Sequence, residues 1–220
     1  MKSIPLPVLH IYEFECDTNL INLAYENLLS HNIKWVDNVD PSNTLNQFGY
    51  LDKEKAIPWY HEELFNWMQT CLDEVSKETI KWPVSICDSW VTKTEYKQKD
   101  GNHFHAFSVF SGVLYFTDVT SSNIVFSYIN HSREKFSNLC PVTVGDGTIE
   151  ITPKKGKLII FPSDLFHFVK THTELKNTRH SLSFNSFFSG QISNTKTAHL
   201  DIEVSGVKER YLQWKENNKD

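Results

Sequence analysis

The sequence lacks the features that mark secreted, disulfide-rich and membrane proteins. Its four cysteines lie far apart without a Cys-x-x-Cys pair, which argues against a disulfide framework or a zinc ribbon and favours reduced thiols. No stretch approaches the roughly 20 consecutive apolar residues of a membrane span, and the N-terminus has no apolar signal-peptide core. These absences predict a soluble, cytoplasmic protein without a membrane partner.

An excess of positive charge is also missing. The chain has 22 basic and 27 acidic residues, which give a net charge of −5 that is spread along the sequence. Because a broad contact with a phosphate backbone needs a basic surface, nucleic acid is not expected as a partner beyond a single-stranded or flipped-out substrate. A small molecule or a peptide is the expected partner, and the oligomeric state stays open, with a homodimer as one option.

Nothing in the sequence divides the chain. It has no internal repeat, no low-complexity segment and no long Pro/Gly/Ser linker, and its length suits one buried core. We therefore expect a single domain over residues 1–220. Within it, residues 1–83 are expected to form a helical support, 84–190 a β-rich core and 191–220 a C-terminal extension.

The N-terminal part has the spacing of two helices that follow a short extended piece, Pro5 to Phe14. Asp17 or Thr18 is suited to cap the first helix, and Pro58 is suited to the first turn of the second, which Trp82-Pro83 ends. Both apolar stripes are interpreted as faces that pack on the core. They consist of Leu20, Ile21, Ala24 and Leu28, and of Leu64, Met68, Cys71, Leu72 and Val75.

From Val84 onward, runs of β-branched and aromatic residues alternate with turn clusters such as Asp100-Gly101-Asn102. Helices followed by many short strands predict a mainly β fold, an antiparallel double-sheet jelly roll with the helices packed on one sheet. A short helix is expected at 207–216. About eight strands fit the pattern, near 85–97, 105–117, 123–130, 136–143, 147–152, 157–161, 166–172 and 179–188.

Three histidines are candidates for a metal site. His103 and His105 are two residues apart, so on a strand both side chains face the same way. Imidazole is a common ligand for borderline metals, and His167, which follows the apolar strand and turn at Phe161-Pro162-Ser163, is a natural third ligand. The alternative is that all three are ordinary surface or core histidines.

Arg179 and Ser181 form a second candidate site, twelve residues beyond His167. The guanidinium fork binds a carboxylate through two parallel hydrogen bonds, and a neighbouring hydroxyl adds another donor. An arginine in the apolar strand 181–188 is costly to bury unless an anion pairs with it. The pattern predicts a site for a dicarboxylic acid, and a structural salt bridge is the alternative.

In this order, the motifs resemble the Fe(II)- and 2-oxoglutarate-dependent oxygenases, in particular a group of small oxygenases from bacteria and phages. The resemblance includes Ser89-Trp90, His103-x-His105 leading into Ser111-Gly112-Val113-Leu114-Tyr115, Gly156-x-Leu158-x-x-Phe161-Pro162-Ser163 with His167, and Arg179-His180-Ser181-Leu182-Ser183-Phe184-Asn185. It implies a cupin-like double-stranded β-helix that uses Fe(II) as cofactor and 2-oxoglutarate as cosubstrate. It also implies hydroxylation of an unidentified substrate, with release of succinate and CO2.

The resemblance also implies roles for individual residues. His103 and His167 would bind the iron, and Arg179 with Ser181 would hold the far carboxylate of 2-oxoglutarate. Tyr96 and Tyr115 would lie near the cosubstrate. Substrate contacts are expected from the segments 45–57 and 130–146, through Tyr50, His131, Arg133 and Phe136.

His105 departs from the family pattern, because a carboxylate usually occupies this position. Three alternatives follow for the third metal ligand. His105 completes a three-histidine set, or a carboxylate such as Asp118 or Asp164 takes its place. In the third alternative the protein supplies only two ligands, which leaves room for a halide as in related halogenases. Three neutral imidazoles would leave the iron with one more net positive charge than the usual triad. Two other functions stay open: a three-histidine cupin-type dioxygenase that uses no 2-oxoglutarate, and an inactive jelly-roll binding module.

Overall fold

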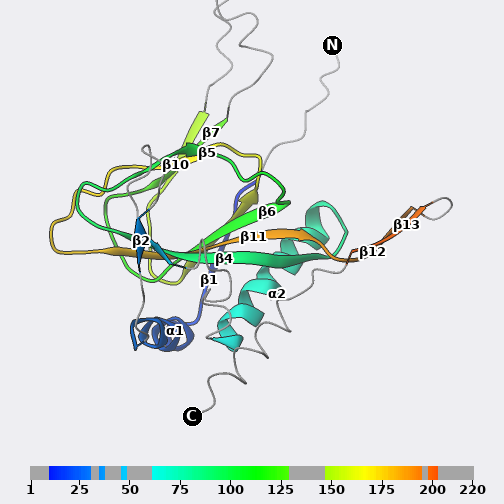
Figure 1. Ribbon diagram of the computed structural model, residues 1–220, viewed down its shortest axis with the longest axis horizontal. Helices are drawn as coiled ribbons and strands as arrows, with labels where there is room; N and C mark the ends of the chain where they lie inside the picture. Colours follow the sequence, from blue (N-terminus) through cyan, green and yellow to red (C-terminus); the bar gives the residue numbers. More distant parts are fainter. Residues whose placement is uncertain are drawn as a thin grey trace, which may run out of the picture.

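The computed structural model describes residues 10–30, 35–37, 46–48, 61–128, 147–194 and 198–202. In these ranges the chain forms two facing antiparallel sheets, and helices α1 and α2 lie on the outer side of the larger sheet (Figure 1). The predicted mainly β double-sheet fold, with the helices packed on one sheet, is confirmed.

The larger sheet has the strand order β1-β9-β6-β11-β4-β3-β2, and the smaller sheet has the order β5-β10-β7-β8. Strands β12 and β13 pair as a separate hairpin. The larger sheet consists of β1 (Tyr12–Glu15), β9 (Lys157–Pro162), β6 (Phe110–Tyr115), β11 (Arg179–Phe188), β4 (Val84–Thr94), β3 (Asn46–Phe48) and β2 (Val36–Asp37). The other strands are β5 (Asp100–His103), β10 (His167–Val169), β7 (Ile124–Tyr128), β8 (Gly147–Ile151), β12 (Gly190–Asn194) and β13 (Ala198–Ile202).

Side-chain bonds fix where the two helices begin. Helix α1 (Thr18–Ser30) is capped by Asp17, whose Oδ1 accepts from the backbone N–H groups of Asn19 and Leu20 at 2.9 and 3.1 Å. Helix α2 (Glu62–Thr79) is capped by His61, whose Nδ1 accepts from the Leu64 N–H at 3.2 Å. Pro58, the predicted start of this helix, lies outside the described residues. Neither of the described helices is long and apolar enough to cross a membrane.

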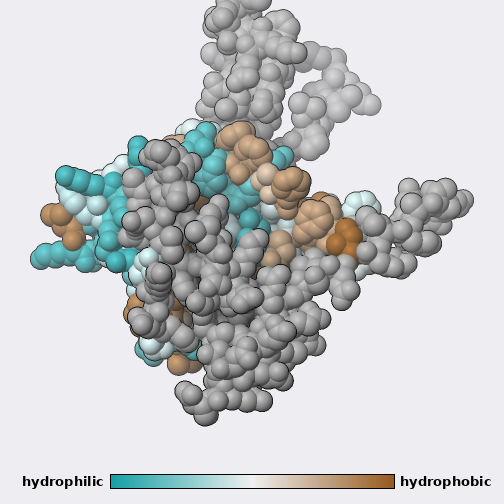
Figure 2. Space-filling model, viewed as in Figure 1, coloured by the Kyte–Doolittle hydropathy of each residue, from teal (hydrophilic) through white to brown (hydrophobic). Residues whose placement is uncertain are grey.

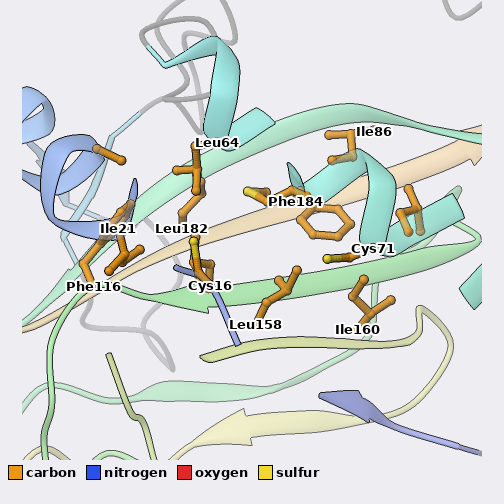
Figure 3. Close-up of a cluster of buried hydrophobic side chains, with 14 of the residues drawn as sticks. Cys16, Ile21, Leu64, Cys71, Ile86, Phe116, Leu158, Ile160, Leu182 and Phe184 are labelled. Atoms are coloured by element: carbon orange, nitrogen blue, oxygen red, sulfur yellow. The ribbon is translucent and has the colours of Figure 1, made fainter. Parts of the chain in front are cut away.

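The alternation of side chains in the larger sheet separates two cores. On β11, Leu182 and Phe184 face the helices and pack with Leu64 and Cys71 of α2, as Figure 3 shows. Residues of the opposite parity face the smaller sheet, where a second cluster includes Val113, Tyr115, Ile124, Phe126, Ile159 and Phe161. The polar residues Arg179 and Ser181 therefore lie between the two sheets.

The region around the histidines differs from the prediction. Asp100-Gly101-Asn102, predicted as a turn, belongs to strand β5, because pairing with β10 overrides the weak strand propensity of these residues. The strand predicted over 105–117 begins only at Phe110, because the chain turns at Phe107, whose φ is +60°. The predicted strand at 136–143 and helix at 207–216 lie outside the described residues. Strands β2, β3, β12 and β13 were not predicted.

His180 lies on the helix-facing side of β11 and is buried. Its Nδ1 is 3.0 Å from the hydroxyl of Tyr25 on α1. Burial, and to a smaller extent the charge of Lys93, lowers the pKa of His180 from 6.5 to about 4, and Glu95 opposes the shift. The folded protein therefore keeps this imidazole neutral at a pH where the unfolded chain protonates it.

We expect His180 to make the metal-free protein less stable as the pH falls from 6.5 to about 4. Between these values the unfolded chain binds a proton that the folded protein does not bind. From pH 7 to pH 5, this difference lowers the free energy of unfolding by about 2 kcal/mol. In urea unfolding at both pH values, His180→Gln should show a loss smaller by that amount. His10→Gln, at an exposed position, is the control, and an unchanged loss in His180→Gln would contradict the assignment.

Candidate metal centre

Three imidazoles meet between the two sheets. His103 ends β5, and His167 begins β10 directly opposite it in the strand register. His105 lies in the loop between β5 and β6. One ligand atom from each of the three lies within 4.8 Å of the others, so the group could hold a metal ion.

The spacing of these nitrogens suits a single ion. The Nε2 atoms of His105 and His167 are 3.3 Å apart. Two nitrogens that each lie about 2.1 Å from one metal, at an angle between 90 and 110°, are separated by roughly 3.0–3.4 Å. The two rings are parallel within 2°. This distance fits two adjacent coordination positions.

Backbone carbonyls orient two of the rings. Nδ1 of His103 donates to the Gly101 carbonyl at 2.8 Å, and Nδ1 of His167 donates to the Leu165 carbonyl at 2.9 Å. A proton on Nδ1 leaves the lone pair of a neutral imidazole on Nε2, which is the usual arrangement of a ligand histidine. In both cases the acceptor lies two residues before the histidine.

His105 is held by contacts of another kind. Its backbone N–H donates to the Ser163 carbonyl at 2.8 Å, and its ring stacks on Trp90 at a centroid distance of 5.6 Å. Two separate elements, β4 and the turn after β9, therefore fix a residue that belongs to no strand.

Burial keeps two of the imidazoles neutral. The pKa of His105 is lowered to about 4 and that of His167 to about 3, chiefly by burial and to a smaller extent by the charge of His103. Neutral imidazoles offer a lone pair without first losing a proton. At neutral pH these two side chains are ready to bind a metal.

Arg179 lies buried in the same interior. Only 2% of the residue is exposed, Nη1 donates to Thr94 Oγ1 at 3.3 Å, and Nε has no partner among the described residues. The guanidinium carbon lies 5.1 Å from the ring centre of Tyr115. Among the described carboxylates, none forms an ion pair with this arginine. The structural salt bridge considered above is therefore not found in this part of the chain.

Ser181 and Tyr115 accompany Arg179, but Tyr96 does not. Ser181 and Tyr115 are buried and face each other in the register of β11 and β6. Burial raises the pKa of the Tyr115 phenol, and the charge of Arg179 opposes the shift. Tyr96 is 45% exposed, and its ring lies near Lys97. Strand β4 ends at Thr94, so the strand face that was predicted to include Tyr96 does not reach it.

No carboxylate joins the three histidines within the described ranges. Asp118 is exposed and accepts from the Lys155 N–H at 2.8 Å, and Asp164 is exposed in the turn after β9. The predicted substrate contacts Tyr50, His131, Arg133 and Phe136 lie outside the described residues. The candidate centre in this part of the chain consists of imidazoles alone.

Thr94 and Asn185 lie at this site but were not among the predicted site residues. Thr94 lies opposite Arg179 in the register of β4 and β11, and Asn185 lies opposite Ser111 in the register of β11 and β6. Strand alternation places Asn185 on the same face as Arg179 and Ser181, so the sequence could have indicated it. Thr94 required knowledge of the strand pairing.

Two facing antiparallel sheets with three clustered histidines between them define a double-stranded β-helix protein with a candidate metal centre. Residues 88–185 match the family model described as "Putative 2OG-Fe(II) oxygenase". This segment contains all three histidines, Arg179 and Ser181. This part of the chain is similar to the 2OG-Fe(II) oxygenases, the superfamily that the motifs of the sequence resemble.

Solved structures share the fold at low sequence identity, and no curated protein matches the chain. The non-haem α-ketoglutarate-dependent epimerase SnoN from nogalamycin biosynthesis has a TM-score of 0.59 and 12% identity over 86% of this chain and 83% of its own. HygX from Streptomyces hygroscopicus, with nickel, 2-oxoglutarate and hygromycin B bound, has a TM-score of 0.58 and 10% identity, over 81% of this chain and 82% of its own. A Pseudomonas putida prolyl-4-hydroxylase has a TM-score of 0.56 and 12% identity, over 80% of this chain and 92% of its own.

Proposed function

We propose that the protein is a non-haem oxygenase that uses Fe(II) and 2-oxoglutarate. His103, His105 and His167 bind the metal, and Arg179 with Ser181 holds the far carboxylate of 2-oxoglutarate. The observation that carries the proposal is a buried arginine without a described anionic partner, in the same interior as three converging imidazoles. The buried arginine lacks an anionic partner among the described residues, and the ligand atoms of the three imidazoles lie close enough to share one metal ion. A dicarboxylate would satisfy the first, and a metal ion would satisfy the second.

The donor set fits Fe(II). Imidazole nitrogen suits iron and other borderline metals, and His103 and His167 already present Nε2 because their Nδ1–H groups are bonded to carbonyls. Trp90 covers one side of His105 and limits access of water to it. HygX, which shares the fold, has been solved with nickel and 2-oxoglutarate bound.

The surroundings of Arg179 fit a carboxylate. The guanidinium presents an Nε–H without a described partner, and Ser181 adds a buried hydroxyl on the same strand face. The Thr94 hydroxyl and the Tyr115 ring hold the guanidinium from two sides. The arginine is thus oriented before its ligand arrives, which lowers the entropic cost of binding.

When bound, Fe(II) and 2-oxoglutarate supply the activation of dioxygen and the oxidation of a C–H bond, with release of succinate and CO2. The protein's residues position the two groups and exclude water from the interior. We propose hydroxylation of a small molecule or peptide as the outcome. The names of SnoN and the prolyl hydroxylase give two different reactions on one fold, so the fold alone does not select the reaction.

Exposed phenylalanines next to the histidines support an apolar contact with the substrate. Phe104, between His103 and His105, is 48% exposed and lies 5.0 Å from the ring of Phe166. Phe107 is 93% exposed. Figure 2 shows hydrophobic residues at the surface of other elements as well. Surface exposure alone therefore does not mark a substrate contact, and we give this role only to the two phenylalanines next to the histidines.

The test is succinate formation by the purified protein. We expect slow turnover of 2-oxoglutarate that requires both Fe(II) and dioxygen, because substrate-free turnover needs only the metal and the cosubstrate. Calorimetry should also show 2-oxoglutarate binding to the Ni(II)-loaded protein and weaker binding to the metal-free protein. A protein that binds neither Ni(II) nor 2-oxoglutarate would be a binding module, and dioxygen uptake independent of 2-oxoglutarate would indicate a cupin-type dioxygenase. Either result would contradict the proposal.

A further inference from the structure

Strand β5 carries one extra residue directly before the candidate metal centre. His103 pairs with His167 of β10, and Asp100 pairs with Val169. Three steps along β5 therefore match two steps along β10. An extra residue of this kind is typical of a β-bulge, which changes the direction of a side chain and often lies beside a functional site. The sequence Asp-Gly-Asn at 100–102 favours such an irregularity, because these residue types suit turns better than regular strands.

The irregularity places the carboxylate of Asp100 beside the imidazole of His103. In a regular strand, residues three apart would face opposite sides of the sheet. Here Oδ1 of Asp100 lies 4.0 Å from Nδ1 of His103. The Asp100 side chain is only 14% exposed, so water screens its charge less than it screens the charge of a surface carboxylate.

Asp100 is neither a ligand nor a hydrogen-bond partner in this arrangement. Its carboxylate is not part of the group of three histidines whose ligand atoms converge. The Nδ1–H of His103 donates to the Gly101 carbonyl at 2.8 Å, and 4.0 Å is too long for a second hydrogen bond. The carboxylate therefore acts on the imidazole through its charge.

This charge offsets a feature of the three-histidine set. The oxygenases that the sequence resembles usually have a carboxylate where this chain has His105, and three neutral imidazoles leave a bound Fe(II) with its full charge. A metal bound at Nε2 withdraws electron density from the ring, so the Nδ1–H side becomes more positive. A carboxylate beside Nδ1 stabilises that charge and makes the imidazole a stronger ligand. Among the described ion pairs, only that of Asp100 includes one of the three histidines.

We propose that Asp100 is a positioning residue of the metal centre, and that its carboxylate supplies beside His103 the negative charge that His105 does not bring as a ligand. The inference rests on the proposed function, because it requires a metal on His103. The carboxylate strengthens the binding of a cation at this centre. It stabilises a trivalent ion more than a divalent one, so it also favours Fe(III) over Fe(II).

The first experiment is calorimetric titration of the metal-free protein with Ni(II). Asp100→Asn removes the charge at nearly unchanged volume and should weaken Ni(II) binding about 10- to 100-fold. Asp100→Glu keeps the charge on a longer side chain and should recover most of this loss. Asp73→Asn makes the same change at an exposed carboxylate of α2, and as the matched control it should keep wild-type Ni(II) affinity.

A redox titration of the iron-loaded protein separates the effect of charge from local damage to the strand. At a fixed potential, the ratio of Fe(III) to Fe(II) in Asp100→Asn should be roughly tenfold lower than in the wild type, because the lost negative charge stabilises the trivalent ion more. A distorted strand alone would weaken the binding of both ions alike and leave this ratio unchanged. Asp100→Ser replaces Asp100→Asn in both measurements if the latter does not fold.

Two results would overturn the inference and leave the proposed function intact. They are wild-type Ni(II) affinity in the folded variant, and a ratio of Fe(III) to Fe(II) equal to that of the wild type. A wild-type protein that binds no Ni(II) would overturn the proposed function as well, because no metal would then lie on His103.

Discussion

His167→Ala is expected to lose tight metal binding and, with it, all 2-oxoglutarate turnover above background. His167 is the most buried of the three histidines, at 4% exposure, and its Nδ1–H bond to Leu165 fixes its ring. Loss of an outer-shell partner alone costs about 10- to 100-fold in metal affinity, so loss of a ligand should cost roughly 100-fold or more. Titration of the metal-free protein with Ni(II) measures the effect.

The control must separate ligand loss from a general effect of removing an imidazole. His10→Ala removes an exposed histidine and should leave Ni(II) affinity and succinate formation unchanged. The free energy of unfolding of both variants, measured without metal, shows whether the fold survives. A folded His167→Ala protein with wild-type Ni(II) affinity would rule out this histidine as a ligand.

The sequence was sufficient for the parts of the fold that depend on local pattern. The stripes of α1 and α2 pack on the core as predicted, with Leu20 only partly buried, because an apolar helix face is stable when it packs against a sheet. Alternation along β11 also placed Arg179 and Ser181 on one face, and the structure has both buried there. Such features need only neighbours in the chain.

The geometry around His105 could not be predicted in the same way. Strand alternation selected His103 and His105 together, but His105 lies in a loop, and contacts from Trp90 and Ser163 bring it to the cluster. The Asp100–Asn102 segment was predicted as a turn because its pairing partner, β10, lies more than 60 residues along the chain. The position of His105 and the strand at 100–102 both depend on contacts with distant parts of the chain, which local sequence propensity does not predict.

Asn185 shows the same limit. Its strand face was evident from the sequence, but its bond partner Ser111 is 74 residues away and depends on β6 and β11 being neighbours in the sheet. Strands β6 and β11 place Ser111 opposite Asn185, and the turn after β9 brings Ser163 Oγ to 2.8 Å from Ser111 Oγ. The sequence contains these residues but does not show that they are neighbours.

Arg179→Gln is expected to weaken 2-oxoglutarate binding by about 100-fold while metal affinity stays near wild type. A bidentate, charge-assisted contact stabilises the bound carboxylate by several hydrogen bonds of about 1.5–3 kcal/mol each, and the amide replaces only part of them. Arg179→Lys keeps the charge without the planar fork and should fall between the two. Calorimetry of 2-oxoglutarate binding to the Ni(II)-loaded variants measures the effect.

The same arginine should lower the stability of the protein without its ligand. A guanidinium that is 2% exposed, with an unpartnered Nε among the described residues, has lost water without gaining an anion. Replacement of such a charge by an apolar side chain of similar volume often stabilises a protein by about 1–4 kcal/mol. Arg179→Met should therefore raise the free energy of unfolding of the metal-free protein and abolish the stabilisation that 2-oxoglutarate gives to the metal-loaded one. A loss of stability in Arg179→Met would mean that this arginine holds the fold together, and the anion site would then have to be sought elsewhere.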